Sequence, residues 1–213
     1  MTVTQILEGA RNSLNALNDT LWTDSELLIS LYRVMLRAAK KTRCISTSAT
    51  QSTVAGTAAY TAPAYASEIW RVTYEGRKLQ PIDRREYDSV NPNAATSSGS
   101  PTYYLLEGET ITLYPTPGAI GSLVVYYYGI PTAVPTSSTT LEIPARYHDV
   151  LMTGLTAEMC PKDVGNPLTV VWSGRFEREL NEMEAHVRKA RRGDAFAVTK
   201  IEEISVSGEF GIV

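Results

Sequence analysis

Residues 101–131 spell PTYYLLEGETITLYPTPGAIGSLVVYYYGIP, and this stretch decides which kind of fold the chain adopts. Two runs rich in aromatic and β-branched residues, 103–114 and 122–128, flank the segment PTPGAIG at 115–121. Tyr, Ile, Val and Thr favour the half-buried surface of a β-sheet, whereas Pro and Gly end such runs and turn the chain. The stretch therefore predicts the core of a β-domain.

Alternating side chains indicate which faces of these strands are buried. In the first run, Ile111 and Leu113 alternate with more polar residues, after a tight turn predicted at 107–109 (EGE). In the second run both faces are largely apolar, as expected of a central strand in a sandwich or barrel. One face carries Val124, Tyr126 and Tyr128, and the other carries Leu123, Val125 and Tyr127.

The β-pattern extends from residue 45 to residue 140 as short runs divided by Ser, Thr, Gly and Pro. Trp70, Val72 and Tyr74 alternate with polar neighbours and predict one strand face, followed by a turn at 75–77 (EGR). Residues 83–88 predict one helical turn, and the apolar-poor loop 91–100 is expected to be exposed.

Helical patterns lie on both sides of this region. Thr2 with Gln5, and Thr23 with Glu26, are possible capping boxes that begin two N-terminal helices. The expected buried face of the second of these helices consists of Leu27, Leu28, Leu31, Val34, Met35, Ala38 and Ala39, opposite a basic outer face of Arg33, Arg37 and Lys41. Two further helices are predicted to start at Pro144 and at Pro167, because proline suits the first helical position.

The two C-terminal helices each show one apolar face. In the helix after Pro144 this face is Tyr147, Val150, Leu151, Leu155 and Met159; in the next it is Trp172, Phe176, Leu180, Met183 and Val187. We expect the N-terminal and C-terminal helices to share one core around Trp22, Leu31, Met35, Leu151, Leu155, Trp172 and Phe176.

These patterns predict an α+β protein. Residues 1–44 and 141–193 are expected to form a four-helix α-domain, with an antiparallel β-sandwich or barrel of residues 45–140 inserted into it. Residues 194–213 are expected to form an extended C-terminal arm, because Ile204, Val206, Phe210 and Ile212 alternate with polar residues or glycine. The alternative is that the arm folds back as an edge strand on its own β-domain.

Composition and charge restrict the possible function. The formal net charge is −3, and a sequence-specific DNA-binding protein would normally carry a strongly basic stripe. The basic clusters 40–43 and 188–192 end predicted helices, where cations complement the helix dipole, although phosphate or partner binding stays open. No apolar run approaches the ~20 residues that span a membrane. Cys44 and Cys160 fit neither a disulfide framework nor a zinc site and are expected to be reduced thiols.

The sequence offers little for catalysis, cofactors or metals. His148 and Asp149 diverge by about 100° on a helix and cannot act as an oriented pair. Glu182 and His186 share a helix face, but a metal site would need a further ligand. We therefore expect no enzyme activity, no cofactor and no metal, and a structural or surface role for both histidines.

Several pieces of the chain, in order, resemble the head-to-tail adaptor (connector) proteins of tailed bacteriophages. These pieces are LWTDSELL at 21–28, AGTAAY at 55–60, IWRV at 69–72 and GRKL at 76–79, followed by residues 101–131. The resemblance covers approximately residues 21–182 and rests on packing motifs, not on a chemical signature.

The resemblance implies a structural virion protein that forms a homo-oligomeric ring, typically a dodecamer, in the neck between capsid and tail after assembly in the host cytoplasm. Such a ring contacts the portal protein and a tail or nozzle protein, continues the DNA channel without specific DNA binding, and involves no membrane. The alternative is a binding module whose aromatic β-domain recognises a carbohydrate or a peptide. An enzyme with an unrecognised site is the least favoured class.

The residues expected to make the assembly interface lie at the end of the chain. They are the apolar residues of the arm and the basic residues that precede it: Ile204, Val206, Phe210, Ile212, Val213, Arg188, Lys189, Arg191 and Arg192. An apolar strand with unpaired backbone groups pairs readily with a sheet edge of another chain.

Overall fold

The computed structural model describes residues 1–14, 21–90, 97–162 and 167–192, apart from the side chains of Val90, Lys162 and Arg192. Within these residues the protein is mixed α+β, with five α-helices, several largely antiparallel sheets and no closed barrel. The chain divides into two compact units. One contains Met1–Cys44 and the described residues from Ala133 to Arg192, and the other is Ile45–Thr132.

The helical unit contains α1 (Val3–Ser13), α2 (Asp24–Thr42), α4 (His148–Met159) and α5 (Leu168–Arg192). Both predicted capping boxes are present, with the hydroxyls of Thr2 and Thr23 accepting from the backbone N–H groups of Gln5 and Glu26. These caps satisfy backbone donors that have no partner inside a helix, which fixes where α1 and α2 begin.

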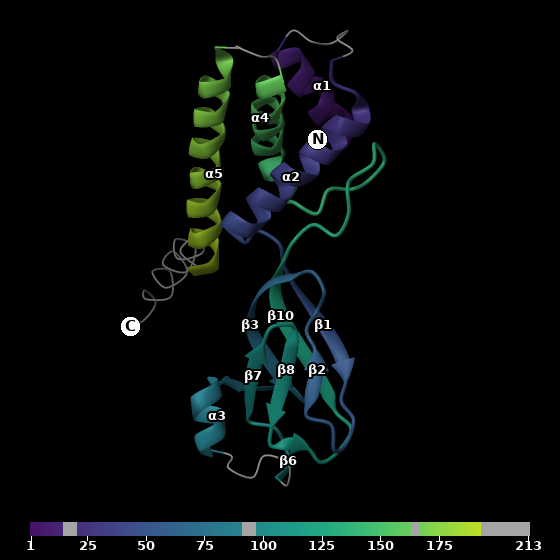
Figure 1. Cartoon of the computed structure of the whole chain (residues 1–213), viewed down its shortest axis with the longest axis vertical. Coiled ribbons are helices and arrows are strands. Elements are labelled where there is room, and N and C mark those ends of the chain that lie inside the picture. Colours follow the sequence, from purple (N-terminus) through teal and green to yellow (C-terminus); the bar gives the residue numbers. More distant parts are fainter. Residues whose placement is uncertain (15–20, 91–96, 163–166, 193–213) are drawn as a thin grey trace, which may run out of the picture. The chain divides into compact units, whose positions relative to one another are not determined.

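Helix α4 is the centre of the helical unit and contacts α1, α2 and α5 (Figure 1). The prediction of a single apolar face on this helix is wrong, because residues on nearly all its sides are buried, Thr153 and Thr156 included. Pro144 does not begin it either: Pro144 precedes a short 3-10 helix, Ala145–Tyr147, from which α4 continues. A helix surrounded by neighbours needs no polar face.

Close packing around α4 depends on a glycine. A Cβ atom at Gly154 would lie 2.6 Å from Cγ1 of Val34 in α2 and 2.7 Å from Cε2 of Phe176 in α5. Such distances are far inside van der Waals contact, so the three helices approach as closely as they do only because position 154 has no side chain.

Helix α5 buries Phe176, Leu180, Met183 and Val187 along one face, as the spacing predicts. Trp172, the first residue of that predicted face, is only half-buried, and the guanidinium of Arg175 lies over its indole ring. The expectation that Trp172 forms part of the buried core is therefore corrected, whereas the other six residues expected in this core are buried.

The β-unit contains two four-stranded sheets. The first has the order β1-β10-β3-β4, from β1 (Ser46–Ser52), β10 (Ser122–Gly129), β3 (Ala66–Tyr74) and β4 (Arg77–Lys78). The second has the order β2-β8-β7-β5, from β2 (Ala59–Thr61), β8 (Thr110–Tyr114), β7 (Tyr103–Glu107) and β5 (Gln80–Pro81). The predicted central strand is β10, paired on both sides.

The smaller elements of this unit are α3 (Arg84–Val90) and the short parallel pair β6 (Ser98–Gly99) and β9 (Thr116–Pro117). The helical turn expected at 83–88 is part of α3. Both predicted hairpin turns are confirmed, at 75–76 between β3 and β4 and at 108–109 between β7 and β8. Glu75 and Gly76 both have positive φ, of 48° and 75°, as a tight two-residue hairpin requires.

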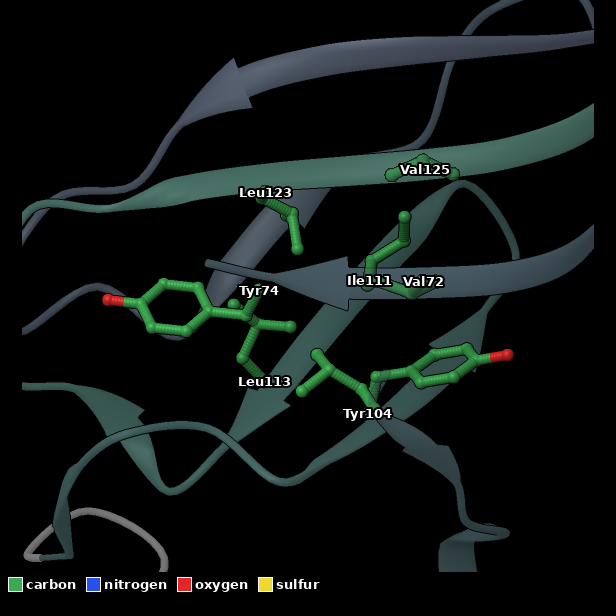
Figure 2. Packing of buried hydrophobic residues seen from close by; sticks show 8 residues of the cluster. Val72, Tyr74, Tyr104, Ile111, Leu113, Leu123 and Val125 are labelled. Carbon is green, nitrogen blue, oxygen red and sulfur yellow. The ribbon is translucent and has the colours of Figure 1, made fainter. Parts of the chain in front are cut away.

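Buried side chains from both four-stranded sheets form one cluster. Figure 2 shows Leu123 and Val125 of β10 close to Ile111 and Leu113 of β8, with the residues of the other strands around them. All four are almost fully buried, so the inward faces predicted for β8 and β10 are confirmed.

Replacing Gly154 with alanine should destabilise the helical unit by about 1–3 kcal/mol, because overpacking a close-packed core forces side chains or backbone to shift. The matched control is Gly174→Ala in α5, where a Cβ would meet no atom within 4 Å. That change should stabilise the helix by about 1 kcal/mol. Urea unfolding followed by the helical circular dichroism signal measures both, and equal effects of the two substitutions would contradict the packing described for α4.

Candidate assembly surfaces

Within the basic cluster at the end of α5, Arg191 is engaged within the chain. Arg188 and Lys189 are exposed. Arg191 reaches the end of α2, where its Nη2 donates to the carbonyl oxygens of Thr42, at 3.0 Å, and Arg43, at 2.5 Å. These carbonyls belong to the last turn of α2, where helix C-termini attract cations. Arg191 thus ties α5 to α2 within the chain.

The other residues expected at the assembly interface cannot be assigned to a surface from the described residues. Ile204, Val206, Phe210, Ile212 and Val213 lie outside the described residues, as does the side chain of Arg192. Arg188, Lys189 and Arg191 are all exposed, and of these three Arg191 also donates to the end of α2.

The basic face of α2 is engaged within the chain too. Arg37 forms a salt bridge with Glu177 of α5, and Lys41 lies 3.1 Å from the same carboxylate. Arg37 also lies over the ring of Phe176. Both residues are nevertheless exposed, as expected of an outer face, so these ion pairs lie at the surface of the helical unit.

Both histidines make contacts inside the helical unit. The ring nitrogens of His148 lie 2.9 Å from the carbonyl oxygens of Met1 and Ile143. Nδ1 of His186 lies 2.7 Å from the hydroxyl of Tyr147, whose pKa is raised by burial. Within the described residues, no group of three or more His, Cys, Asp or Glu side chains could hold a metal ion. None of the helices described is long and apolar enough to cross a membrane.

An aromatic patch lies on the outer face of the sheet that contains β3 and β10. Trp70 packs against Tyr126 at a ring distance of 5.5 Å and stacks on Tyr128 at 6.2 Å. The guanidinium of Arg71 lies 5.4 Å from the centre of the Tyr126 ring. Trp70 nevertheless remains 43% exposed. This patch combines flat apolar rings with a cation, a combination common at interfaces.

The position of Trp70 corrects the strand face predicted from alternation. Val72 and Tyr74 are buried as expected, but Trp70 is on the opposite face. The register explains the difference: Arg71 pairs with Tyr126 and Ile69 pairs with Tyr127, which leaves Trp70 as the extra residue of a β-bulge. A bulge shifts the alternation by one residue, and single-sequence periodicity does not reveal it.

The surfaces described so far are exposed basic side chains on α5 and an exposed aromatic patch on the β3–β10 sheet. Comparison with known families gives a match: a sequence model of the SU10 adaptor protein family matches residues 1–199. The chain belongs to the SU10 adaptor protein family, which confirms the resemblance to phage head-to-tail adaptors. Membership makes it a structural phage protein and a virion component that associates with other parts of the virion. Among curated proteins, none matches its sequence.

Replacing Arg191 with alanine should destabilise the helical unit by about 1 kcal/mol, because the last carbonyls of α2 lose two charge-assisted hydrogen bonds. Lys189→Ala removes the same charge from an exposed position of the same helix and should change the stability by less than about 0.5 kcal/mol. Urea unfolding checks the difference, and equal midpoints for the two variants would show that Arg191 does not hold the end of α2.

Proposed function

We propose that this protein is the head-to-tail adaptor of its phage and that its copies form a ring between portal and tail in the neck of the virion. The observation that carries the proposal is the family match over residues 1–199, which spans both compact units. The ring would continue the DNA channel, seal the filled capsid and offer a docking surface for a tail or nozzle protein. The dodecameric state is proposed from the family resemblance.

The finer architecture we propose is one four-helix domain with an inserted β-sandwich. The helices from both ends of the chain bury residues in one unit, and both large sheets contribute to one apolar cluster, which supports this division. Helices of the first domain are proposed to dock under the portal and the β-domain to face the tail.

Residues 194–213 are proposed to be the arm that reaches another subunit or the portal. Its apolar residues Ile204, Val206, Phe210 and Ile212 recur at strand spacing, and the exposed Arg188 and Lys189 precede it on α5. An extended segment of this kind binds by adding a strand to a sheet edge.

Removal of residues 201–213 should leave a folded protein that no longer joins the assembly, because the contacts among the described helices and strands do not involve these residues. Co-sedimentation of full-length and shortened chains with the purified portal of the same phage, combined with circular dichroism, measures this. A control chain with Lys200→Ala keeps the apolar strand and should sediment like the full chain. Normal binding by the shortened chain would rule out the arm, and loss of folding would favour the fold-back alternative.

DNA should pass through the ring without being held. Affinity for DNA rests largely on neutralised phosphates, yet the net charge is −3, and Arg37, Lys41 and Arg191 are engaged within the helical unit. At about 150 mM salt we expect the dissociation constant for short duplexes to be micromolar or weaker. Specific DNA-binding proteins usually bind their sites more tightly than this. Fluorescence anisotropy of a labelled duplex measures it, and tight binding would contradict the proposed channel.

A binding module remains the second candidate, since the patch of Trp70, Tyr126 and Tyr128 could stack on a sugar ring or a peptide. Binding of the full chain to a glycan array, lost on Trp70→Ala, would favour this function. Binding to portal that is unaffected by the same substitution would favour the adaptor.

A further inference from the structure

The first turns of α5 carry an exposed apolar surface. Val170 is 81% exposed and Val171 is 61% exposed, and Leu168 beside them is exposed as well. We call these three residues the α5 patch. Single exposed apolar residues are common on protein surfaces, but three within one helix turn form a patch, and such patches mark interaction sites.

Gly174, one turn further along α5, adds to this surface. A Cβ there would meet no atom within 4 Å, so the fold of the chain does not need the glycine. A glycine in an exposed helix interior destabilises the helix by about 1 kcal/mol relative to alanine. A close approach by another polypeptide beside the α5 patch would explain why the residue is small.

The same helical unit contains a groove that is partly lined by apolar side chains and could therefore receive an apolar residue. Two hollows of about 300 Å³ each adjoin one another, because Glu158 at the end of α4 lines both. We call them together the α2–α4 groove. Its apolar lining residues are Trp22, Leu27, Ile29, Met159, Ala157 and Phe176. Ile29 is 47% exposed, so an apolar side chain entering the groove would bury additional surface on both partners.

Val171 and the groove face in different directions. Ser173 and Glu177 of α5 line the groove. On a helix with 3.6 residues per turn, Val171 is about 160° away from Ser173 and about 120° away from Glu177, whereas Val170 is only about 20° away from Glu177. Val171 therefore cannot enter the groove of its own chain, whereas Val171 of a second copy can. A contact between two different surfaces of identical chains repeats from copy to copy and closes into a ring where the rotation allows.

Charge favours the same pairing. Two carboxylates, Glu26 and Glu158, and one guanidinium, Arg33, line the hollow next to Trp22, which makes it net negative. Arg178 is exposed on α5, four residues after Gly174 and so on the same side of the helix. A cation beside the α5 patch is thus available to face the carboxylates of the groove.

We infer that the α5 patch of one copy docks into the α2–α4 groove of the next copy, with Val171 as the inserted side chain and Arg178, about 20° from it around the helix, facing Glu158. This inference deepens the proposed adaptor function and rests on it, since it names a contact that would join neighbours in the ring. The occupant of the groove is a second copy of this chain.

Cysteine cross-linking tests the direction of this contact. Full-length chains carrying Val171→Cys together with Ile29→Cys are treated with a short bismaleimide at about the concentration used for assembly. Both positions are exposed, so folding should be retained, which circular dichroism checks. Cys160 is buried, and burial raises the pKa of the Cys44 thiol, so the native cysteines should react slowly. Wild-type protein treated identically gives the background.

The double variant should give a ladder of dimers, trimers and larger products, whereas each single variant should stay monomeric. A Val171→Asp chain, which is expected to fold, should lose the self-association that light scattering measures. The control is Glu109→Lys, an exposed position in the β7–β8 turn, and this variant should self-associate like the wild-type protein. Products that stop at dimers, or that form from either single variant, indicate a symmetric contact and overturn the inference.

The outcome also separates this inference from the proposed function. Rings of wild-type protein in electron micrographs without a ladder from the double variant would overturn the α5-patch contact and leave the adaptor function standing. The absence of both rings and ladder, alone and with portal, would overturn both.

Discussion

The helical unit depends on one close approach, that of α2 and α5 to the middle of α4 at Gly154. Val34 and Phe176 occupy the space that any side chain at position 154 would need. On the other side of α4, the sulfur atom of Met152 lies 2.4 Å from the position that a Cβ atom on Gly9 of α1 would occupy. Small residues at both contacts let the surrounding helices bury α4 nearly completely, which explains why even its threonines are inside the unit. The core is therefore specified by shape as much as by hydrophobicity.

This arrangement couples the two ends of the described chain. Residues of α1 and α2 precede the β-unit and residues of α4 and α5 follow it, yet they share one core. The salt bridges of Glu177 with Arg37 and Lys41, and the bonds from Arg191 to the end of α2, add polar links between the same helices. These links join the same helices that share the core, so packing and polar contacts both hold the two parts of the chain together.

Sequence alone predicted the features that depend on neighbours close in the chain. Both capping boxes, the two hairpin turns, the buried face of α5 from Phe176 onward and the central position of β10 follow from local patterns of residue type. The errors have one cause in common. The environment of α4 and the outward position of Trp70 are set by segments distant in sequence, and periodicity carries no information about these.

The assembly surfaces were predictable to a smaller extent. The basic cluster at the end of α5 is visible in the sequence, but only the structure shows that Arg191 donates to the end of α2. The sequence does not predict the α5 patch, because an apolar run such as VVW at 170–172 is typical of a buried helix face. Only the structure shows that both valines are exposed. Electron microscopy of the full-length protein bound to its portal tests the central claim most directly. Class averages should show closed rings of equivalent copies around a central channel, whereas single copies scattered on the portal, or no bound protein, would contradict the adaptor ring.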